Sequence, residues 1–200
     1  METIRDELLE LWFGVEQDDA EAGKRQADLW WGQSPATDEM LTARFGQAAA
    51  WAAGGFFDHW TGSPRGRLAL ILLLDQLPRV IHRGSPAAFA QDGRARQVAD
   101  RGLASSADRL LRPIERVFFY LPFEHSEDRG DQRRSVELFS VLTDEVPEGW
   151  RATFDGYLDY AVRHRVIIDR FGRFPHRNAI LGRESTPEEI EFLKEPGSGF

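Results

Sequence analysis

A basic segment in an acidic chain is the first place where chemistry could occur. Residues 171–183 contain four basic side chains and no Asp or Glu, whereas the whole chain has a formal net charge of -8. The basic side chains are Arg173, His176, Arg177 and Arg183. Arginine can donate two parallel hydrogen bonds to a carboxylate or a phosphate, so the segment suits a small-anion site. It suits equally an internal network, in which these arginines pair with acidic residues of the same chain.

A second group of polar residues lies at residues 124–131. Its members are Glu124, His125, Glu127, Asp128 and Asp131. We expect this group at the start of a helix, where acidic side chains are favoured by the helix dipole without any function. The alternative is chemical, because His125 and Asp128 are three residues apart and could form an acid/base pair. The standard spacings of metal-binding helices are missing, so the sequence predicts no metal site.

Two further positions could join such a site. Asp75 and Arg79 are four residues apart, so they share one side of a helix if that helix continues past Pro78. His164 lies in the otherwise apolar stripe of a long helix predicted over residues 150–171. A histidine in that position is either a hydrogen-bonded core residue or a member of a site.

The composition excludes several classes of protein. There is no Cys, which excludes disulfides, thiolate metal sites and a cysteine nucleophile. The acidic balance argues against a nucleic-acid partner. The N-terminus lacks a signal peptide, and the apolar run at residues 68–74 is far shorter than the roughly 20 residues that span a bilayer. The sequence therefore predicts a cytoplasmic protein without a membrane partner.

Apolar residues recur at helical spacing along the chain. The predicted helices lie near residues 4–12, 19–31, 41–52, 64–81, 86–103, 113–121, 124–142, 150–171 and 187–194. Residues 68–74 are apolar on every face, which is typical of a helix at the centre of a protein. About eight or nine helices with short connections predict an all-α fold, an array of antiparallel helical hairpins in a single domain over residues 1–200.

Three segments carry a family resemblance. In residues 68–84, 118–132 and 168–193 the chain resembles an uncharacterised bacterial family, the domain of unknown function numbered 924. The resemblance implies a tetratricopeptide-like α-α superhelix, and it implies no substrate. One departure is Val80, which stands where the family pattern usually has Asn. The polar residues shared with the pattern are Asp75, Gln76, Arg79, Arg83, Glu124, His125, Glu127, Asp128, Gln132, His164, Arg170, Arg173, His176, Arg177, Asn178 and Arg183.

Two hypotheses follow for the function. In the first, residues 75–83, 124–128 and 171–183 meet in a pocket that binds or acts on a small anionic molecule. The ligand-binding side chains would be Arg79, Arg173, Arg177, Asn178, Asp75, Gln76 and His164. His125 or His176 would be the general acid/base, with Glu124 or Asp128 orienting the imidazole. In the second, a tetratricopeptide-like scaffold binds a peptide or protein partner, and the polar cluster is purely structural. The sequence leaves open whether there is a reaction and which cofactor it uses.

Overall fold

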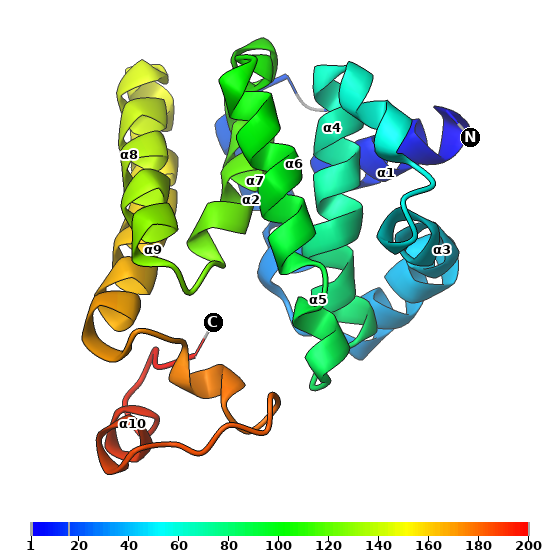
Figure 1. The fold of residues 1–200 in the computed structure, drawn as a ribbon. Helices are drawn as coiled ribbons and strands as arrows, with labels where there is room; N and C mark the ends of the chain where they lie inside the picture. Colours follow the sequence, from blue (N-terminus) through cyan, green and yellow to red (C-terminus); the bar gives the residue numbers. More distant parts are fainter. Residues whose placement is uncertain (1, 16, 200) are drawn as a thin grey trace.

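The computed structural model describes residues 2–15 and 17–199, and within these ranges it is helical without any strand (Figure 1). The predicted all-α class and its array of helical hairpins are confirmed. The first half contains α1 (Glu2–Phe13), α2 (Asp19–Trp31), α3 (Pro35–Ala53), α4 (Pro64–Ile71) and α5 (Leu77–Ile81). The second half contains α6 (Asp92–Ala104), α7 (Pro113–Glu124), α8 (Arg129–Glu145), α9 (Glu148–Phe171) and α10 (Pro187–Phe192). Five short segments, η1 to η5, connect them: Asp58–Gly62, Leu72–Gln76, Pro86–Phe89, Ala107–Leu110 and Pro175–Arg177.

The predicted central helix is α4, η2 and α5 in succession, and it is surrounded by other helices (Figure 1). Every residue from Leu68 to Leu77 is buried. Pro78 does not end the helix, because η2 is a π-helical segment and absorbs the distortion that a proline causes. Asp75 and Gln76, the last residues of η2, are thereby placed on the buried surface of a continuous helix.

The prediction of one helix starting at Glu124 is wrong. Glu124 is the last residue of α7, and Pro122 lies inside that helix. Asp128 is the N-cap of the next helix, where its carboxylate accepts hydrogen bonds from the backbone of Gly130 and Asp131. The end of α7 is stable because the buried Gln132 amide donates to carbonyls of the turn, at 2.5 Å to Glu124 and 2.7 Å to Ser126.

The C-terminal segment turns back under the α8–α9 hairpin (Figure 1). Gly172 ends α9 with φ 69°, a left-handed conformation that glycine adopts readily. Beyond it, Phe174 and Phe192 pack with the end of α9 in a small second core. This fold-back places Arg177 of η5 over the Phe89 ring of η3. None of the helices described here combines the length and the apolar character needed to cross a membrane.

Candidate functional site

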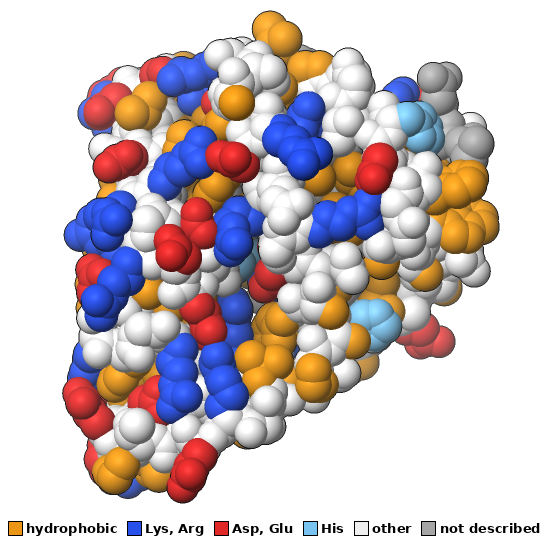
Figure 2. Space-filling view, in the orientation of Figure 1, with side chains coloured by type: hydrophobic (Ala, Val, Ile, Leu, Met, Phe, Trp, Pro, Cys, Tyr) orange, Lys and Arg blue, Asp and Glu red, His pale blue; other side chains and the backbone are white. Residues whose placement is uncertain are grey.

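A cavity of about 1010 Å³ lies between α2, α5, α7, α9 and the C-terminal segment. The three polar segments predicted to meet all contribute to its wall. Of the predicted site residues, the cavity is lined by Gln76, Arg79, Glu124, His125, His164, His176 and Arg177. The face shown in Figure 2 carries Lys and Arg side chains intermingled with Asp and Glu over α8 and the C-terminal segment, so basic residues form no uniform patch there.

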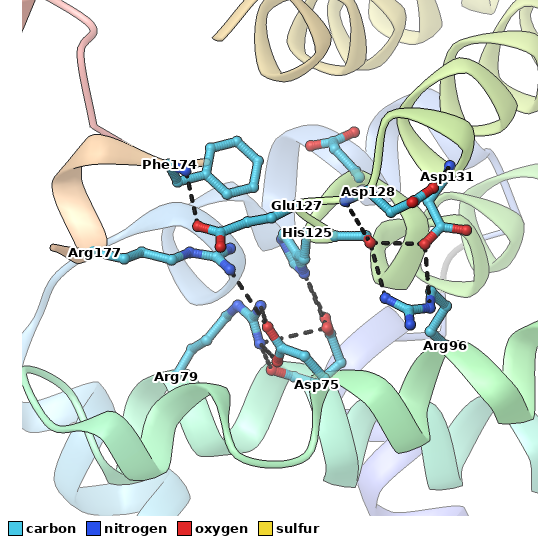
Figure 3. Close-up of polar contacts among 12 residues, drawn as sticks. Asp75, Arg79, Arg96, His125, Glu127, Asp128, Asp131, Phe174 and Arg177 are labelled. Carbon is cyan, nitrogen blue, oxygen red and sulfur yellow. Dashed lines mark hydrogen bonds and ion pairs between the residues drawn. The ribbon is translucent and has the colours of Figure 1, made fainter. Parts of the chain in front are cut away.

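Asp75 and His125 form a hydrogen-bonded pair beside the cavity (Figure 3). His125 Nδ1 lies 2.9 Å from both Asp75 carboxylate oxygens, and Asp75 is fully buried. Burial alone would raise the pKa of Asp75, but the Arg79 charge and the hydrogen bonds from His125 and Gln76 hold it well below its usual range. Burial and the nearby Arg79 lower the pKa of His125. The pair is therefore a carboxylate and a neutral imidazole at neutral pH, with the Nδ1 proton directed at Asp75.

The second nitrogen of His125 is consequently the one available for chemistry. No described residue hydrogen-bonds Nε2 of this ring, which lines the cavity with 14% of its side chain exposed. A neutral imidazole that donates through Nδ1 carries its lone pair on Nε2. Sequence reasoning expected Glu124 or Asp128 to orient the ring, whereas Asp75 does so across 50 residues of chain.

Glu124 is a carboxyl group in an unfavourable place for a negative charge. It is buried, it ends α7 where the helix dipole disfavours anions, and its Oε1 lies 3.3 Å from His164 Nδ1. Burial, together with the charge on Asp75, raises the pKa of Glu124 to about 8. Glu124 is thus protonated at neutral pH and can act as a proton donor.

His164 and His176 are neutral members of the same wall. His164 Nδ1 donates a hydrogen bond of 2.8 Å to the Tyr160 carbonyl one helical turn earlier, and burial lowers its pKa well below the usual value. Burial and the adjacent Arg177 charge lower the pKa of His176 to about 4. Neither ring carries a charge near pH 7.

Arg177 differs from the other arginines of the cluster. Its side chain is 8% exposed and makes no hydrogen bond within the described ranges; its nearest carboxylate contact is Asp92 at 3.7 Å. The guanidinium carbon lies 4.7 Å from the Phe89 ring centroid and 4.5 Å from that of Phe174. Burial and the Arg79 charge lower the pKa of Arg177 to about 10, so it remains a cation.

Arg79 is by contrast fully engaged. Its guanidinium donates two hydrogen bonds of 2.9 Å to the Asp92 carboxylate and a third to the Asp75 backbone carbonyl. Asp92 and Phe89 were missed by sequence reasoning. The sequence predicted one helix over residues 86–103 with Asp92 in its interior, and this is wrong: η3 ends at Phe89, and α6 begins at Asp92, which is thereby placed within hydrogen-bonding distance of Arg79.

Three predicted site residues lie away from the cavity. Arg173 pairs with Glu189 at 2.6 Å and lowers the pKa of that carboxyl to about 2. Asn178 hydrogen-bonds Ser185 and Glu189. Asp128 caps α8. In each case the side chain faces a structural partner, so none of the three belongs to the ligand-binding or catalytic group that we propose.

A smaller cavity of about 320 Å³ adjoins the same groups, and Phe89, His125 and Arg177 border both spaces. The described residues contain no group of three or more His, Asp or Glu side chains arranged to hold a metal ion. The chemistry that this wall offers is therefore a general base at His125, a proton donor at Glu124 and a buried cation at Arg177.

The fold and this cavity define an all-helical protein with a polar site between its helical hairpins. The chain belongs to the family described as "Bacterial protein of unknown function (DUF924)", which it matches over residues 8–197. Its structure is similar to that of the protein of unknown function ATU0120 from Agrobacterium tumefaciens, with a TM-score of 0.75 and 38% sequence identity, over 88% of this chain and 99% of that one. No curated protein matches the chain.

Proposed function

We propose that the protein binds a small anionic molecule in the large cavity through Arg177 and acts on it by proton transfer at His125. The observation that carries the proposal is the Arg177 guanidinium, which is 8% exposed, has no hydrogen-bond partner at Nε among the described residues, and has its nearest carboxylate, Asp92, at 3.7 Å, beyond hydrogen-bonding distance. A buried charge without hydrogen bonds costs several kcal/mol, and an anionic ligand would recover that cost.

The charges around the cavity favour an anion as well. Five basic side chains line it, Lys24, Arg79, Arg83, Arg163 and Arg177, whereas Glu124 is the one carboxyl group among the described lining residues. Because Glu124 is protonated at neutral pH, it does not repel an anion. Lys24, Arg79 and Arg83 also pair with carboxylates outside the lining, so they attract an anion less than Arg177 does.

The reaction class is general acid–base catalysis. His125 Nε2 would remove a proton from the bound molecule or from a water, and Asp75 would stabilise the imidazolium that forms. Glu124 would return a proton to the departing or rearranging atom. Arg177 would fix the anionic group beside these two groups, because its edge N–H donors suit a carboxylate or phosphate.

The rival scaffold hypothesis explains part of the cluster. Arg79, Arg173 and Arg183 each pair with a carboxylate, at 2.9, 2.6 and 2.7 Å, as internal struts would. Among the described residues, Arg177 approaches a carboxylate no closer than 3.7 Å, at Asp92, and makes no hydrogen bond to it, and for that reason we favour the ligand-binding function.

A thermal-shift screen with phosphate and small carboxylates tests the proposal. A ligand at 100 times its Kd adds about 2.7 kcal/mol, which shifts the Tm of a domain of this size by roughly 5 to 11 °C. The shift should disappear in Arg177→Met and persist in Arg173→Met, a control outside the cavity. If both variants keep or both lose the shift, Arg177 is not the anion-binding group.

A further inference from the structure

We propose that the ligand is an amphipathic anion, with a carboxylate or phosphate head at Arg177 and an apolar body that lies between α7 and α9. This inference rests on the proposed function, since it names the class of molecule that the same site takes.

The shape of the cavity supplies the first argument. Residues of α7 and α9 line the cavity in matching pairs. At the polar end, Glu124 and His164 lie 3.3 Å apart. Toward the N-termini of both helices, the next pairs in the lining are Leu121 with Tyr160 and Val117 with Tyr157. Seven residues of α-helix separate Glu124 from Val117, a length of about 10 Å. A slot two helical turns long therefore leads away from the polar end. The whole cavity, of about 1010 Å³, far exceeds what a lone inorganic anion fills.

The wall of this slot is apolar and aromatic. Trp31 lines it with its ring stacked on Phe118 at 5.7 Å and close to Tyr157, with centroids 6.4 Å apart. Trp31 and Tyr160 remain 47% and 51% exposed, so they form a half-open apolar surface that a ligand can cover.

The charged residues on the lining away from Arg177 already have partners. Lys24 pairs with Glu21 at 2.7 Å, and Arg83 pairs with Asp38 at 2.9 Å. Arg163 lies over the Tyr160 ring. Arg177 is therefore the group that we expect to bind the anionic head of the ligand, and the slot is expected to bind its apolar body.

Calorimetric titration with acetate, butanoate, octanoate and dodecanoate, below their micelle concentrations, tests the inference. Affinity should rise about fourfold for each added methylene until the slot is filled. Octylammonium, with the same body and the opposite charge, should not bind. Octyl phosphate at matched concentration distinguishes a phosphate head from a carboxylate head.

A variant that fills the slot tests where the body lies. Gly156 lines the cavity on α9, and nothing lies within 4 Å of the position its Cβ would take, so the Cβ of Gly156→Leu meets no neighbouring atom and its side chain extends from the cavity wall. Gly149→Leu is the matched control, because Gly149 is also on α9 with open space around it but lies off the cavity. Octanoate should bind at least tenfold more weakly to Gly156→Leu than to wild type, acetate should be unaffected, and Gly149→Leu should behave as wild type.

Three results would count against the inference. Binding of acetate and octanoate with equal affinity, lost in Arg177→Met, would overturn the amphipathic ligand and leave the anion site standing. Equal binding of octylammonium would overturn recognition of the head. Absence of binding by any of these anions, inorganic phosphate included, would overturn both the inference and the proposed function.

Discussion

Replacing Glu124 with glutamine should stabilise the protein, and increasingly so as the pH rises. Burial raises the pKa of Glu124 from 4.5 to about 8 in the folded protein. Between those values the folded state keeps the proton that the unfolded chain has lost, so the contribution of Glu124 to stability is complete below about pH 4.5 and declines as the pH rises to about 8. Glutamine has nearly the same shape and does not titrate.

The size of the effect follows from the same pKa difference. A tenfold change in proton affinity corresponds to about 1.4 kcal/mol, and each pKa is half-titrated at its own end of the range from pH 4.5 to pH 8. The free energy of unfolding of Glu124→Gln should therefore exceed that of wild type by about 4 kcal/mol more at pH 8 than at pH 4.5. Urea unfolding followed by tryptophan fluorescence, at intervals across this range, measures the difference directly. Other titrating groups are common to both proteins and cancel.

Glu127→Gln is the matched control with the opposite sign. Burial would raise the pKa of Glu127, but the hydrogen bonds from Arg183 and the Phe174 backbone and the charges of Arg183 and Arg177 together lower it. The contribution of Glu127 to stability is therefore present at neutral pH and is lost as the pH falls through the folded pKa. Glu127→Gln should therefore be less stable than wild type at pH 7, and the deficit should shrink in acid. If the stability curves of Glu124→Gln and wild type run parallel from pH 5 to 8, Glu124 is ionised and the proton-donor role is refuted.

Three further substitutions test the packing and the polar pair. Asp75→Asn should lower the free energy of unfolding by about 3 to 5 kcal/mol in urea titrations, because it leaves Arg79 without one of its buried partners; a loss below 1 kcal/mol would contradict the pairing. Thr186→Ala removes the N-cap of α10 and should cost about 1 kcal/mol, a difference that urea titration resolves. Gly102→Ala places a Cβ against the Phe119 ring and should cost about 1 to 3 kcal/mol, so an unchanged Tm would show that the ring moves aside freely.

Local chemistry explains which parts of the fold were predictable. The starts of α4 and α10 follow from a Ser or Thr cap and a proline, whose effects act within one turn. The boundary at Glu124 was mispredicted because Pro122 is a helix breaker by local rules. Gln132, on the next helix, donates a hydrogen bond to the backbone carbonyl of Glu124 at the end of α7. No local sequence pattern indicates this contact.

The site was predictable as a set of segments and not as a set of contacts. The sequence predicted that Arg173 and Arg177 both bind the anion. In the structure the η5 turn begins between them, and their side chains have different surroundings. Arg173 reaches the capping carboxylate Glu189, whereas Arg177 enters the cavity. Likewise, the pairing of Asp75 with His125 depends on how α7 crosses the central helix, which residue spacing does not encode.

The anion site at Arg177 is tested most directly by NMR of the arginine side chains in ¹⁵N-labelled protein. The resonances of Arg177 and Arg173 are assigned with the Arg177→Met and Arg173→Met variants, and the wild type is titrated with octanoate and with inorganic phosphate. We predict that the Arg177 side-chain signals shift in a saturable manner while those of Arg173 stay fixed. Arg177 signals that do not move, or that move no more than those of Arg173, would contradict the account.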